Sequence, residues 1–149
     1  MIGILTGEQI EDMLKQNVLG RIGCHYNNKT YVVPVNYAYD GKSIIAHSVD
    51  GMKVSIMRKN PAVCFEVDEM ISFTKWKSVI AWGQYQELTS ERDRQYAMKL
   101  FVDRMMQIKI SKSAMVGPLL HGEANQGSSI KAIVYRIIIT EKTGRFEDD

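Results

Sequence analysis

Residues 43–68 read S-I-I-A-H-S-V-D-G-M-K-V-S-I-M-R-K-N-P-A-V-C-F-E-V-D. The β-branched run at 43–46 predicts a strand, and 52–58 predicts a helix of about two turns. A second strand is predicted at 62–68, because its apolar and polar residues alternate. A polar loop separates the first strand from the helix, and the rest of the chain is interpreted around this strand-loop-helix-strand unit.

The polar loop carries groups that suggest chemistry. His47 provides an imidazole, Lys53 an ammonium, and Ser48 and Ser55 provide hydroxyls. Gly51 lets a ligand approach the backbone N–H groups at the helix start. Such donors together with a cation suit a phosphate. The local pattern leaves open a plainer interpretation, in which the helix is simply capped and Lys53 is solvated.

Further strands are predicted on both sides of this unit. Asn27-Asn28 and Asp40-Gly41 are hairpin turn signals, so the strands that they join are expected to be antiparallel. Pro34 cannot donate a hydrogen bond to a neighbouring strand, and it therefore needs a sheet edge or a bulge. The additional strands are predicted at 19–26, 31–39, 76–88 and 130–140.

Helices are fewer. A capping box formed by Thr6 and Gln9 begins a short N-terminal helix, and a second helix is predicted from Ser90 to about Met105. The glycine-containing segment 111–129 is predicted to be irregular, and the acidic tail is expected to fray. About six strands with few helices predict one domain, spanning 1–149, that is an antiparallel barrel carrying helices.

Composition narrows the possible function classes. The chain has 149 residues, of which 45% are hydrophobic and 24% charged, as in soluble globular proteins. Its formal charge of +2 does not indicate nucleic-acid binding. No apolar run approaches the ~20 residues that span a membrane, and the N-terminus lacks a secretory signal pattern. Cys24 and Cys64 are interpreted as reduced, packed residues, so a cytoplasmic location is expected. The sequence contains no metal-ligand motif or nucleophile elbow.

The order of several motifs resembles that of a known family. Y-V-V-P-V-N-Y-A-Y-D-G at 31–41 is followed by H-S-V-D-G-M-K at 47–53 and by N-P-A-V-C-F-E-V-D at 60–68. W-K-S-V-I-A-W-G-Q-Y-Q-E-L at 76–88 and Y-R-I-I-I-T-E-K-T-G-R at 135–145 come later. Together they resemble the pyridoxamine 5′-phosphate oxidase-like flavoproteins, specifically the branch that contains the Nim-type nitroimidazole reductases.

This resemblance implies a mainly β fold, a six-stranded antiparallel split β-barrel with peripheral helices. It also implies a homodimer with FMN, or alternatively FAD, bound in two clefts between the subunits. Lys53 would hold the phosphate, and His47 and Ser48 would border the ribityl chain. Arg136 or Arg145 would reach in from the partner. The remaining cofactor-binding residues implied by position are Pro34, Val35, Asn36 and Tyr37 along the flavin ring, with Ser78 and Trp82 on a neighbouring strand.

Two departures from the true pyridoxamine phosphate oxidases bear on the reaction. V-V-P-V-N-Y replaces their basic phosphate-binding strand, and their R-L-x-P ending is missing. The resemblance therefore favours reduction of a small planar substrate, such as a nitroaromatic, with His47 as the candidate catalytic proton donor. The alternatives are a flavin-binding electron carrier without its own substrate, and a haem-binding relative on the same barrel. Neither nucleic acid nor a membrane is an expected partner.

Overall fold

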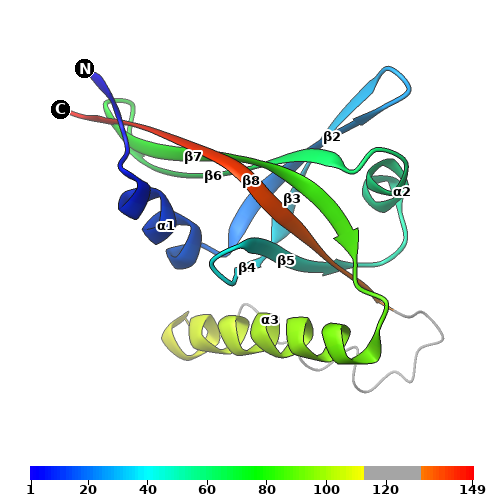
Figure 1. The fold of residues 1–149 in the computed structure, drawn as a ribbon. Coiled ribbons are helices and arrows are strands. Elements are labelled where there is room, and N and C mark those ends of the chain that lie inside the picture. Colours follow the sequence, from blue (N-terminus) through cyan, green and yellow to red (C-terminus); the bar gives the residue numbers. More distant parts are fainter. Residues whose placement is uncertain (113–131) are drawn as a thin grey trace.

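The computed structural model describes residues 1–112 and 132–149. Its strands form one antiparallel sheet in the order β3-β2-β6-β7-β8-β5-β4, and β1 pairs with β8. The sheet curls into a barrel that stays open between β3 and β4, the two ends of this order (Figure 1). The strands are β1 Ile2–Ile4, β2 Leu19–Tyr26, β3 Lys29–Asn36, β4 Ala38–Tyr39, β5 Ser43–Ser48, β6 Ala62–Ser72, β7 Lys75–Glu87 and β8 Ile133–Asp148.

Two hairpin turns follow the residues that predicted them. Asn27 and Asn28 both have positive φ angles, 52° and 62°, as the tight turn between β2 and β3 requires. In the second turn the Asp40 carboxylate accepts hydrogen bonds from the backbone N–H groups of Lys42 and Ser43. Gly41 has a φ of 96° there, a conformation that side chains other than glycine rarely adopt.

The interior of the barrel is built by strand alternation. On β6, Val63, Phe65 and Val67 are buried, while the residues between them face outward. On β7, Val79 and Ala81 are buried in the same way. Both predicted strands are therefore confirmed; one face of each is directed into the core, and the opposite faces form the outer surface of the sheet.

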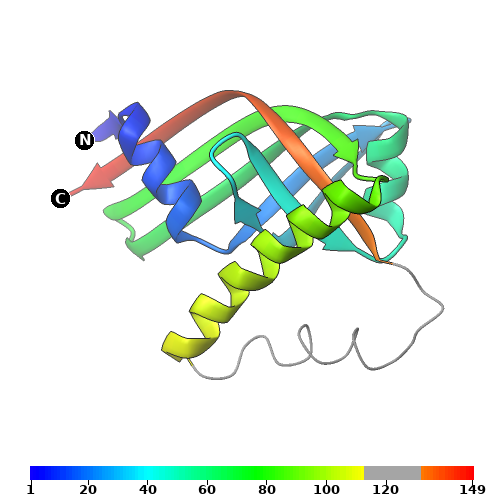
Figure 2. The same cartoon turned by 60° about the horizontal axis from the view of Figure 1, so that its bottom comes forward.

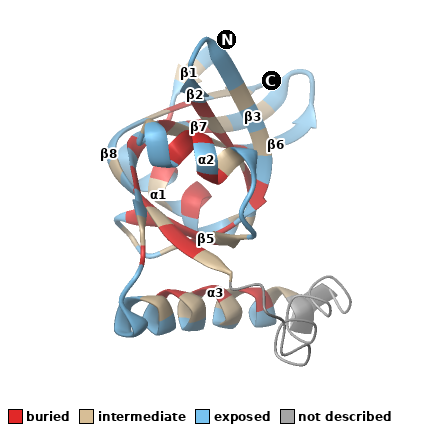
Figure 3. Ribbon diagram, turned by 90° about the vertical axis from the view of Figure 1, so that its right-hand side faces the viewer, coloured by how far each residue is buried: buried red, intermediate tan, exposed pale blue. Residues whose placement is uncertain are grey.

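Two helices close the ends of the barrel. α1 (Gly7–Gln16) begins with the predicted capping box of Thr6 and Gln9 and buries Ile10, Met13 and Leu14. α2 (Met52–Lys59) lies in the opposite mouth, as the view along the barrel shows (Figure 3). Both helices contribute to the same hydrophobic core, so each stabilises the barrel by removing apolar surface from water.

The third helix, α3 (Glu91–Lys112), lies outside the barrel (Figure 2). Ala97 packs with Ile45 and Val134, and Phe101 packs with Ala38, so α3 covers the outer side of β4, β5 and the start of β8. No helix in the described ranges is long and apolar enough to span a bilayer.

The mainly β, antiparallel split-barrel fold is thus confirmed, with two short strands beyond the six expected. β1 was not predicted, and the predicted strand at 31–39 divides at Tyr37 into β3 and β4. The expectation of a frayed tail was wrong, because Glu147 pairs with Ile2 of β1 and with Trp76 of β7. Of the segment expected to be irregular, 111–112 belong to α3 and 113–129 lie outside the described residues.

Candidate functional site

Four predicted site residues lie on the outer face of the sheet. Pro34 and Asn36 are exposed on β3, and Ser78 and Trp82 face outward from β7. Ser78 is in register with Asp68, whereas Trp82 is in register with Cys64. Four residues along a strand correspond to ~13 Å, so one chain does not bring Ser78 and Trp82 into contact.

The free edge of β3 is the first feature suited to a ligand. β3 pairs with β2 and is one end of the strand order, so its other side has no described strand neighbour. Pro34 is tolerated there because no partner needs its missing N–H, which confirms the prediction of a sheet edge. Because the Tyr37 N–H bonds Val18 on the β2 side and backbone groups alternate, the Pro34 carbonyl and the Asn36 backbone on either side of Val35 lie on this free side and can hydrogen-bond a polar ring edge.

The side chains of Val35 and Tyr37 face the core instead. Val35 is buried, and Tyr37 is fully buried with its ring 4.7 Å from that of Phe65. The Tyr37 hydroxyl donates a hydrogen bond of 2.8 Å to the carbonyl of Leu14, and burial raises the pKa of this phenol. Neither side chain can therefore face a ligand at the sheet edge, and the Tyr37 backbone N–H donates to the carbonyl of Val18 at 2.9 Å.

Lys53 and the start of α2 form the second feature. Gly51, the N-cap residue, makes no side-chain cap, and a Cβ placed on it would meet no atom nearer than 4.0 Å. Lys53 in the first turn is half-buried, and burial lowers the pKa of its ammonium. Within the described ranges, no carboxylate lies within 4.0 Å of that ammonium. Uncapped N–H groups beside an unneutralised cation favour an anion.

The sheet edge and the start of α2 lie near the same end of β3. α2 packs against β2, where Cys24 is in register with Tyr31 near the start of β3, and Asn60 at the end of α2 donates a hydrogen bond of 2.6 Å to the His25 carbonyl. From Tyr31 to Val35 the strand advances ~13 Å. An elongated ligand anchored at Lys53 could therefore extend along the free edge.

His47 and Ser48 lie on opposite faces of β5. Ile44 and Ala46 belong to the barrel core, so alternation directs Ser48 inward and His47 outward. The His47 ring meets Phe101 of α3 edge-on, with 4.9 Å between ring centroids. The Ser48 hydroxyl donates to the carbonyl of Val49 at 2.8 Å. The two side chains, predicted to border one ligand, are thus separated by the strand itself.

A groove of about 410 Å³ lies on the outer face near the β2–β3 hairpin, and Trp82 is the one predicted site residue that lines it. Val32 and Cys64 contribute apolar surface, while His25 and Gln84 supply polar groups. Cys64, which the sequence suggests is a packed residue of the core, is instead half-buried and faces this groove, so that interpretation was wrong. Its position between the inward-facing Val63 and Phe65 was the sequence signal for this orientation.

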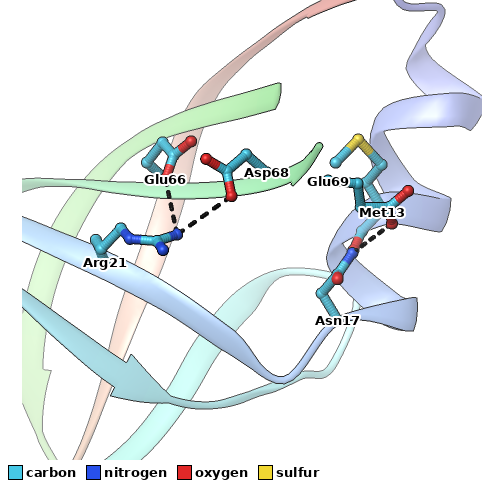
Figure 4. Close-up of polar contacts among 6 residues, drawn as sticks. All are labelled: Met13, Asn17, Arg21, Glu66, Asp68 and Glu69. Atoms are coloured by element: carbon cyan, nitrogen blue, oxygen red, sulfur yellow. Dashed lines mark hydrogen bonds and ion pairs between the residues drawn. The ribbon is translucent and has the colours of Figure 1, made fainter. Parts of the chain in front are cut away.

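A charged cluster occupies the centre of the outer face (Figure 4). Arg21 Nη1 lies 3.4 Å from Glu66 Oε1 and 3.3 Å from Asp68 Oδ1. Burial, followed by the neighbouring charge of Asp68, raises the pKa of Glu66. Sequence reasoning missed this cluster, because it depends on the register of β2 against β6.

Comparison with known proteins identifies the family. A sequence profile described as pyridoxamine 5′-phosphate oxidase matches residues 6–146. The chain belongs to this family. An uncharacterised protein of Rhizobium meliloti is 33% identical over 87 residues, which are 58% of each chain, so the match spans little more than half the length of that relative.

Several solved structures share the fold of this chain. A FAD-binding protein from Mesorhizobium loti has a TM-score of 0.77 at 26% identity, with 99% of both chains covered. A candidate 5-nitroimidazole antibiotic resistance protein from Bacteroides thetaiotaomicron has a TM-score of 0.71 at 14% identity, covering 98% of this chain and 87% of that one. A FAD and haem binding protein from Mycobacterium smegmatis has a TM-score of 0.71 at 12% identity, covering 97% and 72%. The last two show similarity of fold alone.

Proposed function

We propose that this chain is a flavin-dependent oxidoreductase that acts as a homodimer and reduces a small planar substrate, such as a nitroaromatic. The observation that carries the proposal is the uncapped start of α2, with half-buried Lys53, close to the free edge of β3. Similarity to the FAD-binding protein of Mesorhizobium loti supports a flavin as the ligand.

The residues at the start of α2 fit the phosphate of a flavin nucleotide. The N–H groups after Gly51 and the exposed hydroxyl of Ser55 are donors, and Lys53 supplies the positive charge. Ser48, on the inward side of β5, is the proposed contact for the ribityl chain. FMN and FAD both present a phosphate at this point, so both fit the arrangement.

The free edge of β3 is the proposed binding surface for the flavin ring. The Pro34 carbonyl and the Asn36 backbone, on either side of Val35, would hydrogen-bond the polar edge of the ring. When bound, the flavin supplies the transfer of electrons or hydride, and the protein supplies orientation and electrostatics. His47 is the proposed proton donor; its ring lies on the outward side of β5 against Phe101, so it would meet the substrate across the strand from Ser48.

The positions of Ser78 and Trp82 favour a site shared by two copies. They lie on an outward face of β7 that none of the described helices covers, so a second copy packed on this face would enclose them between two subunits. Arg145, which is in register with Ser78, would approach from the same subunit as Ser78. A homodimer that joins two outer faces satisfies this condition.

The visible spectrum of the purified protein tests this function. A flavin spectrum is expected, with bleaching by a reductant and reappearance of the oxidised spectrum when a nitroaromatic is added. Extraction and mass measurement of the chromophore would distinguish FMN from FAD. A colourless protein that cannot be loaded with either flavin would refute the proposal.

The same experiment separates two other functions. A flavin-binding electron carrier would show the flavin spectrum but no turnover with nitro compounds, quinones or B6 vitamers. A haem-binding function, suggested by the shared fold of the FAD and haem binding protein from Mycobacterium smegmatis, would give a Soret band.

A further inference from the structure

We propose that Arg58 is a positioning residue for the phosphate site at the start of α2. It holds the carboxylate of Asp50 away from the helix start, where that carboxylate would compete with the flavin phosphate. The inference rests on the proposed function and names the residues that keep the site open to an external anion. Three contacts of the Arg58 guanidinium and the place of Asp50 in the chain carry it.

The Arg58 guanidinium is fixed in direction by β7. Its Nε donates a hydrogen bond of 2.7 Å to Oε1 of Glu87, and its Nη2 donates one of 3.0 Å to Oε2. The Tyr85 hydroxyl donates to the same carboxylate at 2.9 Å. The Tyr85 backbone N–H donates to the carbonyl of Pro61, just past the end of α2, at 2.8 Å. A guanidinium held by two parallel hydrogen bonds on an anchored carboxylate has a defined orientation.

The third nitrogen of this guanidinium faces the loop before α2. Arg58 Nη1 lies 3.7 Å from Oδ2 of Asp50. Side chains of helical residues are directed toward the helix N-terminus, so Arg58 can reach back along α2 to a residue that precedes the helix. The side chain of Asp50 is 72% exposed, and among the described residues Arg58 is the one cation within 4.0 Å of its carboxylate. The ion pair therefore sets where this carboxylate points.

Asp50 is placed in the chain to act as an internal competitor. It precedes Gly51, the N-cap residue of α2, which has no side chain that could accept from the free N–H groups. A carboxylate is favoured at a helix N-terminus for the same reason as a phosphate. Asp50 is also three residues from Lys53, within reach of its ammonium. Released from Arg58, the Asp50 carboxylate could occupy the N–H groups or neutralise Lys53 in place of the phosphate.

The ion pair directs Asp50 to the other side of the helix. Arg58 and Lys53 are five residues apart, which places them ~140° apart around the axis of α2. Pairing with Arg58 therefore draws the Asp50 carboxylate toward β7 and leaves the Lys53 side open. In this arrangement the start of α2 has no side-chain cap, and within the described ranges no carboxylate lies within 4.0 Å of the Lys53 ammonium.

A double-mutant cycle of flavin binding tests this role. Arg58→Gln should weaken FMN binding by roughly three- to tenfold, because the Asp50 carboxylate is then free to compete. Riboflavin, which lacks the phosphate, should bind as it does to the wild type. Adding Asp50→Ala should restore the affinity for FMN, whereas Asp50→Ala alone should change it little. Lys59→Gln removes a positive charge from the next residue of the same helix and is the matched control, with FMN affinity unchanged.

Glu87→Gln provides a second variant, because it frees the guanidinium that Glu87 orients. It should also weaken the binding of FMN more than that of riboflavin, and Asp50→Ala should again restore it. Equal weakening of FMN and riboflavin binding would overturn the proposal, as would a gain from Asp50→Ala that is the same with and without Arg58. A protein that binds neither flavin would refute the proposed function and this role with it. FMN binding that is independent of Arg58 would refute this role alone.

Discussion

At the scale of single residues, Lys53 should decide the affinity for a phosphorylated flavin. Lys53→Ala removes the cation beside the uncapped start of α2, and we expect FMN binding to weaken by about 1.5–3 kcal/mol, roughly 10- to 150-fold. Fluorescence titration measures the change. Lys59→Ala, at the exposed last turn of the same helix, is the control. Riboflavin lacks the phosphate, so its binding should be unaffected; equal loss of FMN and riboflavin binding would contradict the assignment.

The hydroxyl of Tyr37 should contribute to the stability of the fold. Tyr37→Phe removes the hydroxyl that donates to the Leu14 carbonyl and leaves that carbonyl without its partner. The free energy of unfolding should fall by about 1–2 kcal/mol, measured by urea denaturation. Tyr26→Phe is the control, since Tyr26 is 43% exposed. Equal stability of the two variants would show that the buried hydrogen bond contributes nothing.

Residue types and spacing predicted many of the relevant side chains but not which of them share a site. The alternation that placed Val63 and Phe65 in the core also implied that Cys64 faces outward, and it separates His47 from Ser48 in the same way. The family resemblance assigned residues that are adjacent in the sequence, such as His47 and Ser48, to one site. The strand pleat directs neighbours to opposite faces, so physical grouping requires the sheet.

At the scale of elements, the capping box of α1 should stabilise the end of the barrel. Thr6 accepts a hydrogen bond from the Gln9 backbone, and Gln9 accepts one in return from the Thr6 backbone. Thr6→Ala should lower the free energy of unfolding by about 1 kcal/mol. Chemical denaturation measures this loss, and Thr89→Ala, an exposed site outside any helix, is the control. No loss would mean that tertiary packing alone holds α1.

The ion pair of Arg58 on α2 with Glu87 on β7 should stabilise the fold in a pH-dependent way. Arg58 makes two hydrogen bonds with the Glu87 carboxylate, of 2.7 and 3.0 Å. Hydrogen bonding from Arg58 holds the pKa of Glu87 below its ordinary value of 4.5. A lowered carboxylate pKa contributes stability above the ordinary pKa, and this contribution disappears as the pH falls through the lowered value.

Glu87→Gln should therefore be less stable than wild type near neutral pH, and the difference in free energy of unfolding should shrink as the pH drops below the ordinary pKa of 4.5. Urea midpoints measured across this range would test the prediction. A difference that is constant with pH would assign the effect to packing.

Residue pairs that favour tight turns made most of the strands predictable. Asn27-Asn28 and Asp40-Gly41 specify their hairpins locally, so the adjoining strands followed. β1 and the end of β8 could not be found in this way, because each is held by a partner far away in the sequence. Pairing with β1 and β7, rather than local propensity, orders the acidic tail.

At the scale of the whole molecule, ligand binding should raise thermal stability. A flavin at about 100 times its dissociation constant stabilises the folded state by ~2.7 kcal/mol. We expect FMN or FAD to raise the Tm by several degrees in a thermal-shift assay. Riboflavin at the same concentration should raise it less, because it cannot engage Lys53. Equal shifts for all three ligands would place the phosphate away from α2.

The fold class was predictable because the motif order covers nearly the whole chain, and the family profile at 6–146 confirms it. The shape of the complete site was not, because it depends on which faces remain uncovered after the helices pack. The contact of Arg21 with Glu66 and Asp68 emerges only once β2 and β6 are in register.

The open side of β3 has a consequence for how the chain avoids self-association into fibres. An unpaired strand edge is a template on which a stray strand from another chain can add. An added strand could accept no hydrogen bond from Pro34, because proline has a carbonyl but no N–H. A continuous ladder of backbone hydrogen bonds could therefore not extend past Pro34. The proline that leaves this border open to a small polar ligand therefore also makes it a poor nucleus for aggregation.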